Sequence, residues 1–296
     1  MSEIQSKIDS PRIPSRRQLV LKASLATLAA VGASRLAGLS TVTAAEAENA
    51  AALTDADILN FALNLEYLEA EYYLRATTGK GLSASETTGT GKHGKVTGGA
   101  MVPFKTTSIK EYAEEIAGDE KAHVGFLRAA LGKSAIAEPT INLSTSWNHL
   151  AQAAGLGSSF NPFANETNFL IGAFVFEDVG VTAYHGAARD IKNKDYLDAA
   201  AGILAIEAYH AATIRVVMYE RGLSAQAQKI SDLRNKLGGK GTDQGIVLNG
   251  KANITPAGAN GIAFERIPAE VLNIVYEGGK SNDFGFFPNK VNGAIQ

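Results

Sequence analysis

The stretch AIEAYHAA, residues 205–212, places a glutamate and a histidine three positions apart within an alanine-rich run. The stretch GDEKAHVG, residues 118–125, repeats that spacing with Glu120 and His123. Residues three apart lie on one face of an α-helix, with Cβ atoms about 5–6 Å apart. Each Glu-x-x-His pair can therefore direct a carboxylate and an imidazole toward one metal ion or two neighbouring ions.

Each Glu-x-x-His helix is preceded by a predicted helix that carries its own glutamate. Glu66 is followed seven residues later by Tyr73, and Glu177 is followed seven residues later by Tyr184. The chain thus contains two similar halves, each a Glu helix followed by a Glu-x-x-His helix. Together the halves predict a bundle whose core gathers six metal ligands: Glu66, Glu120, His123, Glu177, Glu207 and His210.

The charge of this predicted core requires cations. Burying an unpaired carboxylate costs on the order of several kcal/mol, and four carboxylates near one another also repel. Two divalent ions would balance them. Because cysteine is absent, nitrogen and oxygen must hold any metal, and such ligands suit iron and manganese. We therefore expect two Fe or two Mn ions; the alternative is that Glu120 and Glu207 are solvated and the histidines are hydrogen-bonded core residues.

Apolar residues at three- and four-residue spacing predict four long helices. The first is predicted to begin with a Thr54–Asp57 capping box and the second with Ser108 and Glu111. A long loop at 79–106 and a long crossover at 133–164, with a short helix at SWNHLAQAA, separate the helices. The fold class is therefore all-α, a four-helix bundle with a long crossover between the second and third helices. The predicted helices cover residues 54–78, 108–131, 165–191 and 195–221.

The two ends of the chain are predicted to lie outside the bundle. SRRQLVLK, residues 15–22, places two arginines before a modestly hydrophobic stretch and the small residues of TVTAAEA. This order predicts a signal peptide over 1–47 that resembles the twin-arginine (Tat) type, so we expect export by the Tat machinery to a periplasmic or extracellular location. The bundle would occupy 48–222, and 223–296 would form a C-terminal extension with helices at 224–237 and 268–276.

Several residues near the predicted site leave alternatives open. Glu69 and Glu71 compete with the first glutamate for the ligand role; Glu69 shares its helix face, whereas Glu71 is predicted to point outward. Tyr73 and Tyr184 either hydrogen-bond ligand carboxylates or pass electrons, or else they pack in the core. His185 is predicted to lie on the outer face of its helix.

Composition excludes several classes of function. The formal net charge is -2 and no long run of one sign occurs in the body of the chain, which argues against a nucleic acid partner. No nucleophile motif and no phosphate-binding loop is present, so catalytic residues remain unknown and no organic cofactor is expected. Few stretches beyond the signal approach the ~20 apolar residues of a membrane span. We expect no stable span in the mature form.

At these residues the chain resembles the ferritin-like superfamily, over about 54–221. DADILNFALNLEYLEAEYY (55–73), ERIPAEVLNIVYEGG (265–279) and GFFPNKVNG (285–293) resemble its desiccation-related branch more narrowly. The resemblance implies a ferritin-like bundle with the same six metal ligands.

Three functions are consistent with this pattern. We expect peroxide or dioxygen chemistry at the metal centre, catalase- or peroxidase-like, in protection against oxidative or desiccation stress. The alternatives are iron oxidation and storage, and a structural stress protein whose metal only stabilises the fold. The sequence leaves open whether identical chains assemble into a homo-oligomer.

Overall fold

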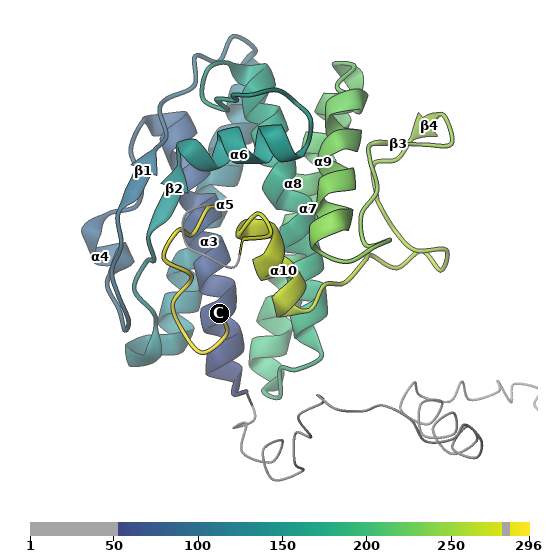
Figure 1. Cartoon of the computed structure of the whole chain (residues 1–296). Coiled ribbons are helices and arrows are strands. Elements are labelled where there is room, and N and C mark those ends of the chain that lie inside the picture. Colours follow the sequence, from purple (N-terminus) through teal and green to yellow (C-terminus); the bar gives the residue numbers. More distant parts are fainter. Residues whose placement is uncertain (1–52, 280–284) are drawn as a thin grey trace, which may run out of the picture. The chain divides into compact units, whose positions relative to one another are not determined.

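The computed structural model describes residues 53–279 and 285–296, so the predicted signal peptide lies outside the described residues. Four long helices form a bundle (Figure 1), in which α3 packs along α5, α7 packs along α8, and α3 also contacts α7. The all-α prediction is confirmed. The bundle helices are α3 (Asp55–Thr78), α5 (Thr107–Leu131), α7 (Glu166–Ala188) and α8 (Lys194–Glu220).

The N-terminus of α3 follows from its local sequence. The Thr54 side chain accepts a hydrogen bond from the backbone N–H of Asp57, and the Asp57 carboxylate accepts one from the backbone N–H of Thr54. At the other end Gly79 takes a left-handed conformation, with φ of 74°, which glycine adopts without steric cost. The predicted start and end of this helix are both confirmed.

The N-terminus of α5 does not follow from its local sequence. The helix begins at Thr107 with Thr106 as its N-cap, so the predicted Ser108–Glu111 cap is wrong. Glu166, in the first turn of α7, instead accepts hydrogen bonds of 2.9 Å from the backbone N–H groups of Lys105 and Thr106. A carboxylate distant in sequence thus fixes the entry into α5.

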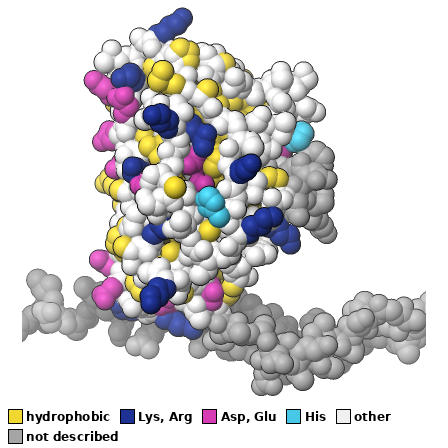
Figure 2. Space-filling view, turned by 90° about the vertical axis from the view of Figure 1, so that its left-hand side faces the viewer, with side chains coloured by type: hydrophobic (Ala, Val, Ile, Leu, Met, Phe, Trp, Pro, Cys, Tyr) yellow, Lys and Arg dark blue, Asp and Glu magenta, His cyan; other side chains and the backbone are white. Residues whose placement is uncertain are grey.

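The two long connections pair with each other. Within the predicted loop 79–106, α4 (Ala84–Thr87) and β1 (Val96–Gly98) are regular, and β1 pairs in parallel with β2 (Ile141–Leu143) of the crossover. The crossover also contains the 3-10 turn η1 (Gly132–Ser134) and α6 (Thr145–Ala153), close to the predicted short helix. Figure 2 shows the face that includes α4 and β1, where Lys and Arg side chains lie dispersed among uncharged and hydrophobic ones.

The C-terminal residues pack on the bundle. α10 (Pro268–Val275) contacts α7 and α9 (Ser224–Leu237), and Figure 1 shows α6 and α10 lying across the same face of the bundle. A small hairpin of β3 (Val247–Leu248) and β4 (Lys251–Ala252) follows α9. Near the end of the chain the backbone N–H of Asn292 donates to Asn64 Oδ1 of α3 at 3.0 Å.

Within the described residues, α8 is long and apolar enough to cross a membrane by length and composition alone. A core helix of a soluble protein can meet the same criterion. In this structure α8 packs along α7, and its buried residues include Glu207 and His210.

Candidate metal centre

The six residues predicted as metal ligands meet inside the bundle. α3 supplies Glu66 and α7 supplies Glu177, while α5 and α8 each supply one Glu-x-x-His pair. The carboxylates of Glu120 and Glu207 are completely buried, and His123, the most exposed of the six, is 8% exposed. The structure therefore brings all six together; that they bind metal remains a prediction.

Two overlapping groups of these side chains are close enough together that each could hold a metal ion. Glu66, Glu120, His123 and Glu207 offer ligand atoms within 4.8 Å of one another, and so do Glu120, Glu177 and His210. Nδ1 of His123 lies 3.2 Å from Glu66 Oε2 and 3.5 Å from Glu120 Oε2. Because Glu120 belongs to both groups, its carboxylate would help to hold an ion at either position.

Unsatisfied polar atoms at the centre of the bundle fit such ions. Both carboxylate oxygens of Glu120 and of Glu207 are buried without a hydrogen-bond partner, as are Glu177 Oε2 and His210 Nδ1. Nδ1 of His210 lies 3.0 Å from Glu120 Oε1, but the two atoms are not in hydrogen-bonding geometry. Leaving buried carboxylate oxygens unpaired is strongly unfavourable, and cations between them would remove that penalty.

The protonation of the metal-free centre is strongly perturbed. Burial raises the pKa of Glu66 to about 7. For Glu120, burial acts in the same direction, but contacts with His123 and His210 outweigh it and lower the pKa to about 2. Burial disfavours protonated His123, but Glu66 and Glu120 outweigh it and raise the pKa to about 10. Without metal the imidazole of His123 therefore holds a proton at neutral pH, and a bound ion would displace it.

Two tyrosines orient the carboxylates of α3 and α7, and their hydrogen bonds cross between the halves of the chain. The phenol of Tyr73 on α3 donates to Glu177 Oε1 on α7, and the phenol of Tyr184 on α7 donates to Glu66 Oε1 on α3. Both tyrosines are buried. Of the alternatives that the sequence left open, the structure shows hydrogen bonding to the predicted ligands.

Asp119 is a site residue that sequence reasoning missed. Its Oδ2 lies 3.1 Å from Nε2 of His210, on the side of the ring opposite to Nδ1. A carboxylate in this position fixes the tautomer and orientation of a metal-binding imidazole. Asp119 comes directly before Glu120 and is off the buried stripe of α5, so helical spacing gives no signal for it.

The two other glutamates of α3 have different surroundings. Glu69 is buried, and its pKa is raised well above the ordinary value by burial and by the nearby charges of Glu120 and Glu177. Glu71 points away from the predicted ligands, as expected, but it is buried, at 1% exposed. It accepts hydrogen bonds from Arg75 and from the backbone N–H of Leu82, because the connection after α3 folds back over this helix.

A glycine makes room for the fourth carboxylate. In the aligned halves, Gly180 on α7 occupies the position that Glu69 occupies on α3, three residues after the first glutamate. A Cβ atom at position 180 would lie 2.0 Å from Glu207 Oε2. Gly180 therefore lets the Glu207 carboxylate approach α7, and any side chain there would displace it.

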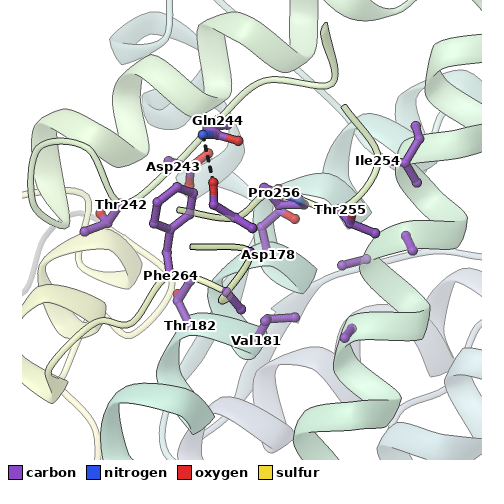
Figure 3. A pocket seen from close by; sticks show the side chains of 16 residues that line it. Asp178, Val181, Thr182, Thr242, Asp243, Gln244, Ile254, Thr255, Pro256 and Phe264 are labelled. Atoms are coloured by element: carbon purple, nitrogen blue, oxygen red, sulfur yellow. Dashed lines mark hydrogen bonds between the residues drawn. The ribbon is translucent and has the colours of Figure 1, made fainter. Parts of the chain in front are cut away.

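A separate cavity of about 290 Å³ lies between α7, α8 and residues 242–264 (Figure 3). Asp178 and Thr182 of α7, alanines of α8 and Phe264 are among its lining residues. None of the six predicted ligands lines it. His185 is also turned away from the centre, since its Nδ1 donates to the carbonyl oxygen of Phe264 at 3.0 Å.

Comparisons with known proteins agree with the ferritin-like fold. The family described as Ferritin-like domain matches residues 54–220. Desiccation-related protein PCC13-62 of Craterostigma plantagineum is 31% identical over 242 residues, which cover 74% of this chain and 76% of that protein. Ferritin-like catalase Nec2 of Nesocodon mauritianus is 29% identical over 265 residues, which cover 81% of this chain and 84% of that protein. No solved structure gives a significant match.

Proposed function

Because the chain belongs to the ferritin-like domain family, we propose that it is an exported protein that holds two iron or two manganese ions and removes peroxide with them. The ligands in this proposal are the six residues predicted from the sequence. The observation that carries it is the set of buried, unpaired oxygen and nitrogen atoms where the four helices meet. The relative named as a ferritin-like catalase supports peroxide as the substrate.

The chain's own residues suit this chemistry. Two redox-active ions of this kind, when bound, supply two-electron exchange with peroxide. Glu120 would contribute to both positions, and the phenols of Tyr73 and Tyr184 hold the Glu177 and Glu66 carboxylates in fixed orientations. The buried apolar side chains of α3 and α7 exclude bulk water from the centre, which strengthens every charge interaction there.

The proposal is tested by elemental analysis of the mature protein, purified from its own host without chelator. We expect about two Fe or Mn per chain, from the requirement that four carboxylate charges be balanced. The loaded protein is then given hydrogen peroxide while dioxygen release and peroxide consumption are both followed. Glu120→Gln, which keeps the size of the side chain, is the control.

Each outcome separates the proposed function from its alternatives. Metal with peroxide consumption that Glu120→Gln abolishes supports the proposal. Metal without peroxide consumption favours a structural role for the ions, and a large mineral-filled assembly favours iron storage. Folded, helical protein that never acquires metal would remove the centre altogether.

A further inference from the structure

A row of buried aromatic rings leads away from the candidate centre on one side. It begins at Tyr73, whose phenol donates to Glu177 Oε1. The ring of Tyr72 lies edge-on to it, with centroids 5.1 Å apart, and the ring of Trp147 lies 5.6 Å from that of Tyr72. All three side chains are at most 1% exposed, so the row is shielded from solvent along its length.

Phenol and indole rings are chemically suited to give up single electrons. Among protein side chains, tyrosine, tryptophan and cysteine are the most readily oxidised, and this chain has no cysteine and only one tryptophan. Rings in van der Waals contact allow an electron to pass between them without movement of the backbone. At the end of such a row, Trp147 is therefore placed to supply an electron as well as to pack in the core.

The row exists in only one half of the chain. Tyr184 makes the equivalent hydrogen bond to Glu66, but no ring contact of Tyr184 is found among the described residues. A small cavity beside it is lined largely by aliphatic side chains, including Ile58, Ala187 and Ile191. Both phenols thus donate to a predicted ligand carboxylate. Among the described residues, Tyr73 contacts further aromatic rings and Tyr184 does not.

The row ends in an outer layer of the molecule. Trp147 belongs to α6, which lies across the bundle (Figure 1), and its neighbour Thr145 on the same helix is exposed. The indole Nε1 of Trp147 has no hydrogen-bond partner. Within the described residues, the path from Glu177 to this layer consists of three rings.

We propose that Tyr73, Tyr72 and Trp147 form a path by which single electrons enter the centre. The proposal rests on the proposed function, with hydrogen peroxide as the oxidant. During peroxide reduction Tyr73 gives up one electron, and its phenol proton moves along the hydrogen bond to Glu177 Oε1. An electron from Trp147, passing through Tyr72, and the returning proton restore the Tyr73 phenol.

The path needs an external one-electron reductant such as ascorbate. This reductant gives an electron to the indole radical cation of Trp147 and so returns the ring to its neutral form. Two electrons delivered in this way and two protons from solvent convert one peroxide into two waters. Tyr72 acts as a conduit, since its hydroxyl donates at 2.8 Å to the carbonyl oxygen of Phe169, which is too weak a base to take the proton. The path would let the centre complete peroxide reduction when no second peroxide is available to donate electrons.

The test uses full-length, metal-loaded protein exposed to hydrogen peroxide without added reductant. Radicals are followed by electron paramagnetic resonance and oxygenated side chains by peptide mass spectrometry. We expect oxygenation of the wild type to concentrate at Trp147. In Tyr73→Phe it should fall to the level of metal-free protein. Tyr184→Phe disturbs a predicted ligand carboxylate in the same way without cutting the path, so its Trp147 oxygenation per peroxide consumed should match that of the wild type, whatever its rate of consumption. Added ascorbate should suppress it in the wild type.

A second variant guards against loss of metal in Tyr73→Phe. Trp147→Phe leaves the Tyr73–Glu177 hydrogen bond in place, and we expect a longer-lived tyrosyl radical in that protein. Equal Trp147 oxygenation in wild type and Tyr73→Phe, or an unchanged radical lifetime in Trp147→Phe, would overturn the path.

Failure of the proposed function is recognised separately. If the loaded wild type consumes no peroxide, the peroxide proposal fails, and dioxygen is then added to the anaerobically reduced, loaded protein as the oxidant. A radical on Tyr73 or Trp147 under those conditions supports the path. Absence of any such radical with both oxidants refutes it.

Discussion

Two buried clusters of charged side chains meet at consecutive residues of α7, and their carboxylates have different partners. Glu177 belongs to the candidate metal centre. Asp178 belongs to a second cluster, here called the arginine cluster, which consists of Arg215, Arg234, Arg266, Asp178 and Asp243. Because successive residues of a helix point in different directions, one turn of α7 serves both clusters.

The arginine cluster contains its own cations. Arg215 donates to Asp178 Oδ2 at 2.7 Å, Arg266 donates to Asp243 Oδ2 at 2.8 Å, and Arg234 contacts both aspartates. Other N–H groups of these arginines donate to backbone carbonyl oxygens, such as that of Asn253. This chain can thus neutralise buried carboxylates with arginine, whereas at the candidate centre the proposed function assigns that role to metal ions.

Removing a cation from the arginine cluster should have the largest effect on stability. Arg234→Met leaves the buried carboxylates of Asp178 and Asp243 with fewer partners, and we expect the free energy of unfolding to fall by about 3–5 kcal/mol. Chemical denaturation followed by circular dichroism measures it. Arg189→Ala, which breaks the exposed Arg189–Glu265 pair, should cost no more than about 1 kcal/mol; similar losses in both variants would contradict the contrast.

Replacing a carboxylate at the centre should lower the metal content and leave the fold intact. Glu120→Gln should release metal from both positions because Glu120 belongs to both ligand groups, while helix content is retained. Glu177→Gln should affect mainly the position beside His210. Metal content by mass spectrometry and helix content by circular dichroism check both variants; full metal occupancy in Glu120→Gln would remove this residue from the ligand set.

A smaller loss of metal affinity is expected from a change at Asp119, which contacts a predicted ligand but is not one itself. Asp119→Asn keeps the shape of the side chain but weakens its hold on His210 Nε2. Loss of such a partner typically lowers metal affinity by about 10–100-fold. Competition with a metal chelator measures the change, and Asp195→Asn on the first turn of α8 is an unrelated control. Equal affinity in wild type and Asp119→Asn would show that the contact does not orient a ligand.

The pH dependence of stability should separate metal-free from loaded protein. The pKa of His123 rises from 6.5 to about 10 in the folded, metal-free chain. Protonated His123 therefore stabilises the fold fully below pH 6.5, and this contribution disappears as pH rises through about 10. Scanning calorimetry should show a falling denaturation temperature over this range only without metal. Parallel curves would mean that ions do not replace the imidazole protons.

The sequence allowed prediction of features that depend on local spacing. The Thr54–Asp57 cap and the burial of the Glu-x-x-His pairs both follow from residues within one helical turn. Features that depend on distant segments were missed. Glu166 anchors the start of α5 from another helix, and the pairing of β1 with β2 joins two connections. The burial of Glu71 was missed for the same reason, since the connection after α3 covers it.

The crossed tyrosine bonds have a consequence for the origin of the fold. A fragment ending in the crossover would contain Glu66 and Tyr73, but in this geometry each phenol reaches the glutamate of the other half. A single half therefore cannot complete its own centre. Two copies of one half, related by a two-fold axis, would supply each other's phenols. A half-length ancestor built on this geometry would have had to work as a symmetric dimer, and duplication with fusion would have made that pairing permanent.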